Sequence, residues 1–161
     1  MDLLLQSPIV YEPLRKNRFV FRFPSDVGIS EWMVKSGNRP SINQKEVEIP
    51  FLNTSTWVVG RYTWDSLQVT FRSMIAPSSD QALMEWIRLC SESVTGRQGY
   101  AAGYKRDVEL QMLDPTGVAV QLWILKNAWI SQCNFGSLDY NDDELADATA
   151  TIRMDYAVLS Y

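Results

Sequence analysis

Apolar and polar residues alternate with a period of two along four stretches of the chain. These stretches are residues 18–23, 66–72, 107–112 and 149–158. Alternation of this kind gives a β-strand one apolar face and one wet face, which is typical of antiparallel sheets with solvent on one side. We therefore predict a mainly β protein whose last strand runs from Thr149 to Val158.

The segment Asp114-Pro-Thr-Gly117 carries the clearest turn signal. Proline at the second position and glycine at the fourth favour a type I turn. Residues 105–113 should then fold back as a strand onto a second strand, residues 118–127, which ends at Asn127. This is the best-defined hairpin that the sequence predicts.

One stretch has a helical period instead. Ser78 followed by Gln81 forms a capping box, and apolar residues then recur at helical spacing, which predicts a helix from Ser79 to about Ser91. Residues 96–103 contain three glycines and are expected to be a flexible connection. The predicted fold class is α+β, an antiparallel β-sandwich or partial barrel with one helix against an end or side.

Length and composition favour a single domain. Of 161 residues, the first sixteen are interpreted as an N-terminal arm and residues 17–161 as one domain. No signal peptide or membrane-spanning stretch is expected, so the chain should not insert into a membrane. The formal net charge of −4 disfavours sequence-independent binding to nucleic acid phosphates. Cys90 and Cys133 are expected to be reduced.

Catalytic and metal-binding signals are weak. The chain has no histidine, which removes the usual general base and the commonest metal ligand. Residues 139–144 resemble the start of a calcium loop, but Glu144 stands where that loop needs glycine. We expect no catalytic residue, cofactor or metal. Two alternatives stay open: a monomeric β-barrel binding a small apolar ligand, and an acid-dependent enzyme using residues 139–147.

Several segments, in order, resemble the tail tube proteins of contractile-tailed bacteriophages. They are Gly60-Arg-Tyr-Thr-Trp-Asp65, Trp123 to Trp129, Phe135-Gly-Ser-Leu-Asp-Tyr140 and Thr151 to Tyr156. The resemblance runs from about Asn17 to Val158. It implies hexameric rings that close into one barrel and stack into a hollow tube of the virion tail, assembled in the host cytoplasm.

The resemblance also implies partners. These are a contractile sheath outside the tube, a tape measure protein and double-stranded DNA in the lumen, and baseplate and terminator proteins at the ends. A tube protein of a type VI secretion system or another contractile injection system is the alternative in this class, together with a baseplate-proximal tube initiator.

The same hypothesis assigns residues to contacts. The long segment 51–64 and the N-terminal arm are expected to reach neighbouring subunits or rings, and the C-terminal residues 157–161 and Leu14 to lie near such contacts. An acidic row inside the tube would keep phosphate mobile. The contact residues are Leu4, Val10, Tyr11, Phe51, Asn53, Trp57, Arg61 and Tyr62, and the lumen candidates are Gln44, Glu46, Glu48, Asp107 and Glu109.

Overall fold

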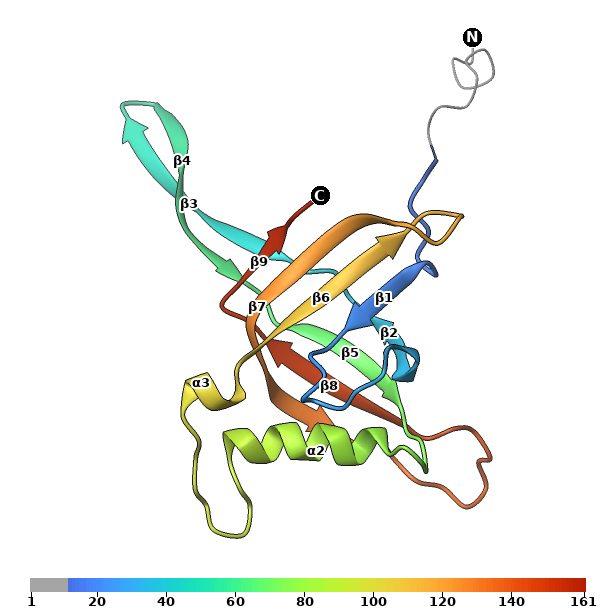
Figure 1. Ribbon diagram of the computed structural model, residues 1–161. Helices are drawn as coiled ribbons and strands as arrows, with labels where there is room; N and C mark the ends of the chain where they lie inside the picture. The colour runs from blue at the N-terminus through green and yellow to red at the C-terminus, as the bar shows by residue number, and fades with distance from the viewer. Residues whose placement is uncertain (1–11) are drawn as a thin grey trace.

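A computed structural model describes residues 12–161 and contains a seven-stranded antiparallel sheet (Figure 1). Its strands follow the order β1-β6-β7-β8-β5-β2, with β9 also paired to β7. This confirms the mainly β, antiparallel sandwich or partial barrel. The strands are β1 (Phe19–Arg22), β2 (Val34–Gly37), β5 (Leu67–Arg72), β6 (Arg106–Leu113), β7 (Ala119–Asn134), β8 (Asp147–Arg153) and β9 (Tyr156–Leu159).

Strand β7 is bent and joins the two halves of the sheet. Its first part pairs with β6 and β9, and its second part pairs with β8. The predicted strand end at Asn127 is therefore wrong. Asn127 instead has a φ of 55° at a register shift opposite Arg106 and Val108, so it forms a bulge inside a longer strand.

The predicted single closing strand from Thr149 to Val158 is also wrong. The chain leaves the ladder at Met154 and Asp155, which separate β8 from β9. Because β8 and β9 pair with different parts of the bent β7, one straight strand cannot serve both. The alternating pattern continues across the break, since Ile152, Met154 and Ala157 are all buried.

The predicted turn between β6 and β7 is confirmed. The Gly117 N–H donates to the Asp114 carbonyl at 3.1 Å, and Gly117 has a φ of 89°. The Asp114 carboxylate also accepts from the backbone N–H groups of Thr116 and Val118, at 2.9 and 2.8 Å. The side chain of Asp114 therefore holds the turn that sets the β6–β7 register.

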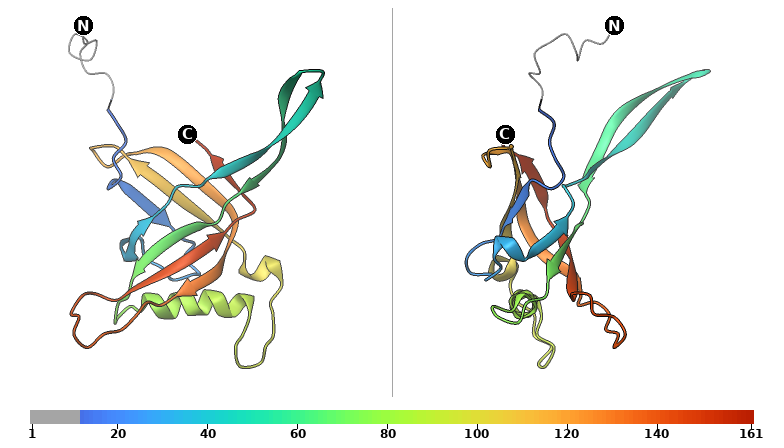
Figure 2. Two further views of the ribbon diagram at one scale, coloured as in Figure 1. Left: turned by 180° about the vertical axis from the view of Figure 1, so that it is seen from behind. Right: turned by 90° about the vertical axis from the view of Figure 1, so that its right-hand side faces the viewer.

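Helix α2 (Ser79–Cys90) confirms the predicted helix and lies across one end of the sheets (Figure 2). Ser78 Oγ accepts from the Gln81 N–H at 3.2 Å, while the Gln81 side chain bonds Glu85 instead of closing the capping box. The expectation of one helix is incomplete. The structure adds η1 (Glu31–Met33) and α3 (Ala101–Tyr104), so the connection after α2 is partly helical.

The core lies between the two halves of the sheet and α2. Trp86 is fully buried, packs edge-on against Phe23, and donates its indole N–H to the Tyr104 carbonyl at 2.8 Å. This bond fixes α3 against α2. Ser79 is the buried polar side chain at the helix start, and its hydroxyl donates to the Arg72 carbonyl at 2.5 Å. Cys90 and Cys133 are not disulfide-bonded.

Candidate assembly interface

A second sheet of two strands projects from the body as a long hairpin. It consists of β3 (Ile42–Phe51) and β4 (Thr54–Trp64), and it extends well beyond the core in both views of Figure 2. Every residue of β3 is exposed, and so is β4 apart from Gly60 and Trp64. Within residues 12–161 the hairpin therefore packs against little else. Because a lone two-stranded ribbon is only marginally stable in water, a further surface is needed to stabilise it.

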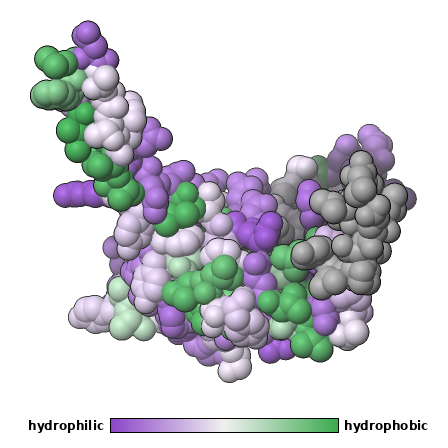
Figure 3. Space-filling view, turned by 90° about the horizontal axis from the view of Figure 1, so that it is seen from above, coloured by the Kyte–Doolittle hydropathy of each residue, from purple (hydrophilic) through white to green (hydrophobic). Residues whose placement is uncertain are grey.

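One face of the hairpin is mainly apolar. The register places Val47 opposite Val58, Ile49 opposite Thr56 and Phe51 opposite Thr54. Figure 3 shows apolar side chains gathered along the projecting hairpin. A continuous exposed apolar surface of this kind marks an interaction site.

The opposite face combines acids with an aromatic residue. Glu46 lies opposite Val59 and Glu48 lies directly opposite Trp57, so both acids share one face with the indole. The sequence did not reveal that the lumen candidates and the contact candidate Trp57 stand side by side.

A bulge bends the hairpin near its middle. The register shifts between the pairs Gln44–Tyr62 and Glu46–Val59, which leaves one extra residue on β4. A Cβ on Gly60 would lie 3.0 Å from Val47 Cγ2 and 3.1 Å from the Lys45 carbonyl oxygen, so glycine permits this close approach. The neighbouring contact candidates Arg61 and Tyr62 are exposed.

The tip of the hairpin is apolar and exposed. The turn consists of Leu52 and Asn53, and β4 begins at Thr54 because β-branched threonines extend the strand. Leu52 has a φ of 52° and is 89% exposed, beside Phe51 at 71%. A leucine in the left-handed region carries backbone strain, and this one leaves its apolar side chain in water. Leu52 is therefore a contact candidate within segment 51–64, although it was not named individually from the sequence.

The second pair of lumen candidates lies on β6. Burial acts to raise the pKa of Asp107, but the Asn127 N–H and the Lys126 ammonium, at 3.1 and 3.0 Å, outweigh burial and lower that pKa. Glu109 is half-buried and its neighbour across the ladder is Arg22. The charge of Asp107 is thus compensated, unlike an open acidic row.

The remaining contact candidates concern the chain ends. Leu4, Val10 and Tyr11 lie outside the described residues, whereas Leu14 is exposed. The C-terminus extends the β9 ladder, since the Ser160 N–H donates to the Leu122 carbonyl at 2.8 Å. The position of β9 at a sheet edge leaves the side chains of Leu159 and Tyr161 exposed.

No group of three or more histidine, cysteine or acidic side chains within residues 12–161 is placed to hold a metal ion. Over the same residues, no helix is long and apolar enough to cross a membrane.

Comparison with known proteins identifies the family of this chain. A family model described as T4-like virus tail tube protein gp19 matches residues 53–158, well over half of the chain. No curated protein matches the chain in sequence.

Solved structures share the fold at low identity. A chain of the anti-feeding prophage cap, described as a tube-terminating cap, has a TM-score of 0.76 at 16% identity, with 99% of both chains covered. A chain of the sheath/tube terminator of an extracellular contractile injection system has a TM-score of 0.68 at 18% identity, covering 94% of this chain and 99% of that chain. A type six secretion system protein has a TM-score of 0.53 at 9% identity, covering 88% and 82%.

Proposed function

The chain belongs to the family of T4-like virus tail tube proteins, and on this basis we propose that it is a tube subunit of a contractile injection system. The family is structural, so the chain is a structural protein and not an enzyme. In the proposed role, copies associate into hexameric rings that stack into a hollow tube.

The observation that carries this proposal is the exposed hairpin β3–β4. Its strands have no core of their own, and the apolar face with Val47, Ile49 and Phe51 needs a cover. A second copy supplies that cover in a homo-oligomer. We assign Phe51 to this contact. Asn53, Trp57, Arg61 and Tyr62 are proposed as further contact residues of the hairpin, with Trp57 on the opposite face beside Glu48, and Leu4, Val10 and Tyr11 as contacts from the arm.

Free sheet edges support ring formation as well. Strands β1, β2 and β9 each pair on one side only within the described residues. Unpaired edges favour uncontrolled association unless they are covered, and a closed ring of copies covers them. Ring contacts are heterologous and close by rotation, whereas stacking contacts continue along the tube.

The kind of injection system is a finer part of the proposal. Likeness to chains of the anti-feeding prophage cap and the extracellular injection system supports a contractile injection system in general. The family description supports a bacteriophage tail, where the lumen would pass double-stranded DNA and hold a tape measure protein. We favour a contractile injection system in general. Capsid and terminase genes beside this gene would identify a bacteriophage tail.

Further partners follow from the same role. A sheath outside the tube, a baseplate at one end and a terminator at the other are proposed because chains of similar fold occur in a baseplate and in a sheath-tube complex. The protein would then reside in a tail-like particle.

For the lumen, we favour the hairpin face with Gln44, Glu46 and Glu48 over Asp107 and Glu109 on β6. Asp107 is ion-paired with Lys126 at 3.0 Å, and Glu109 is half-buried, so this pair is less open to solvent than the acids of β3. Glu46 and Glu48 are exposed and form no ion pair among residues 12–161.

Size-exclusion chromatography with light scattering and negative-stain microscopy of the purified protein test the proposal. Rings or tubes are expected. A species that stays monomeric at high concentration would contradict a tube role and would favour a monomeric ligand-binding barrel.

A further inference from the structure

The two ends of the main sheet face each other without forming a ladder. Strand β1 bonds only β6 and strand β2 bonds only β5 within the described chain. The Phe21 ring of β1 nevertheless packs closely on the backbone of β2, because a Cβ added to Gly37 would lie 2.6 Å from that ring. The sheet thus stops just short of a closed barrel.

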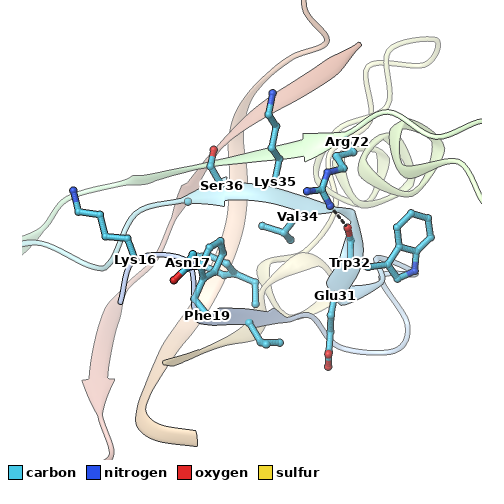
Figure 4. Close-up of a pocket in the computed structure, with 12 residues that line it drawn as sticks. Lys16, Asn17, Phe19, Glu31, Trp32, Val34, Lys35, Ser36 and Arg72 are labelled. Carbon is cyan, nitrogen blue, oxygen red and sulfur yellow. Dashed lines mark hydrogen bonds between the residues drawn. The ribbon is translucent and has the colours of Figure 1, made fainter. Parts of the chain in front are cut away.

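A groove of about 840 Å³ lies between these two edges (Figure 4). Phe19, Val20 and Val34 contribute apolar walls, and the exposed indole of Trp32 stands at one end. A second hollow of about 290 Å³ shares Phe19 and Gly37 with the first and reaches Leu14. The two hollows lie along the same seam and have Phe21 and Gly37 in common, and we call them together the β1–β2 groove.

The rim of the β1–β2 groove is cationic. Lys16 and Arg72 line the first hollow together with Lys35, which is ion-paired with Asp147 at 2.6 Å, and Glu31 is the acid in that lining. Arg15, Lys16 and Arg39 line the second hollow. Arg72 also donates to the Trp32 carbonyl at 2.9 Å, which fixes the end of the groove beside η1 (Figure 4). An apolar strand that carries a negative charge would match this lining.

We propose that the β1–β2 groove receives residues 2–11 of a neighbouring copy as an added strand. This inference rests on the proposed tube function. The segment Asp2-Leu-Leu-Leu-Gln-Ser-Pro-Ile-Val-Tyr11 is mostly apolar and has one charge, a negative one. Added strands bind through main-chain hydrogen bonds, with side chains filling pockets on alternate positions. Pro8 lacks an N–H, so at that position the added strand has no donor and must face away from the edge that it pairs with.

The direction of the chain favours a neighbouring copy over the same copy. Residues 15–18 form a turn at the groove, and the chain before this turn leads away from the body in both Figure 1 and Figure 2. Filling its own groove would require the chain to reverse there. Ten extended residues reach roughly 33 Å, and a domain of this size has a radius of gyration of about 15 Å, so an adjacent subunit lies within reach.

Cysteine cross-linking tests this inference on the full chain. In a background with Cys90→Ala and Cys133→Ala, one variant carries Leu5→Cys and a second carries Ser36→Cys on the groove wall. Mixing the two under mild oxidation should give a disulfide-linked dimer. The matched control pairs Leu5→Cys with Thr95→Cys on an exposed loop outside the groove, and should give at least about tenfold less product.

Several outcomes would overturn the inference. These are no dimer, an equal yield with the control pair, or an intrachain bond in the double variant Leu5→Cys/Ser36→Cys at high dilution. Microscopy of the same samples separates the two proposals: tubes without the cross-link refute only the groove contact, and absence of any oligomer refutes both. Hydrogen exchange gives a second readout. The N–H groups of Phe19 and Gly37 point away from the β6 and β5 ladders, so these amides should exchange at least about tenfold more slowly in assembled protein, and deletion of residues 2–11 should abolish that protection.

Discussion

The side-chain amide of Asn127 donates to Asp155 Oδ2 at 2.9 Å, which ties the bend of β7 to the break between β8 and β9. Lys105 binds the same carboxylate at 3.1 Å, and the Asp155 N–H donates to the Lys126 carbonyl. The hydrogen bond from Asn127 and then that from Lys105 lower the pKa of Asp155. One carboxylate therefore holds together the region where the chain changes its strand partner.

The variant Asn127→Gly tests this bond. Glycine accepts the φ of 55° without strain and removes only the amide. The pKa of Asp155, measured by NMR titration, should rise toward its ordinary value of about 3.9. Stability should fall by less than about 1 kcal/mol at neutral pH, because both side chains reach solvent.

The pH dependence follows from the sign of the shift. The folded-state pKa of Asp155 lies below the unfolded value, so its contribution is complete above about pH 4 and is lost as pH falls through the folded-state pKa. Urea unfolding at several pH values should show a smaller acid-induced loss in Asn127→Gly. An unchanged pKa of Asp155 in this variant would show that Lys105 alone sets it.

The sequence predicted the elements whose signals are local. The turn at Asp114, the helix starting after Ser78 and the alternating strands depend on neighbouring residues, and the structure confirms them. The bulge at Asn127 and the break at Asp155 depend on partners far along the chain, so no local pattern shows them. α3 was missed because four residues are too short for a helical period, and a distant contact with Trp86 holds it.

The candidate interface could be predicted only in part. The unusual length and aromatic content of residues 51–64 pointed to a contact surface. However, their division into an apolar face and an acidic face depends on the register with β3 and on the bulge at Gly60. The β1–β2 groove arises from two edges that are joined only through the order of the whole sheet, so the sequence could not reveal it.

The tip residue Leu52 should lower the stability of the monomer and contribute to the contact between copies. Leu52→Gly removes a left-handed non-glycine residue, so the free energy of unfolding should stay unchanged or rise by up to about 1 kcal/mol. Assembly should weaken, because the exposed side chain is lost from the contact. Thermal melts and light scattering measure the two effects, and normal assembly of a stabilised Leu52→Gly variant would remove the contact role.

Trp57 should act as an anchor of the hairpin contact. It is 57% exposed, so Trp57→Ala should leave a folded monomer. Hot-spot truncations typically cost about 2 kcal/mol or more, so the concentration needed for assembly should rise by more than about tenfold. Trp57→Phe is the matched control and should retain most assembly by sedimentation velocity. If both variants assemble like the parent, the indole lies outside the interface.

Reversing the acidic row should change what the tube holds. If Glu46 and Glu48 line the lumen, each acid is repeated around the ring, and Glu46→Lys with Glu48→Lys would create rings of positive charge that attract phosphate. Tubes assembled with short duplex DNA should then protect that DNA from nuclease, whereas parent tubes should not, and protection should weaken as salt rises.

The control variant Asp142→Lys with Asp143→Lys makes the same net charge change on the loop between β7 and β8, and it should bind DNA without protecting it. Equal protection by both variants would place Glu46 and Glu48 on the outer wall. Failure of the Glu46→Lys/Glu48→Lys protein to assemble, with its fold intact by circular dichroism, would instead place these acids beside Trp57 in the subunit contact.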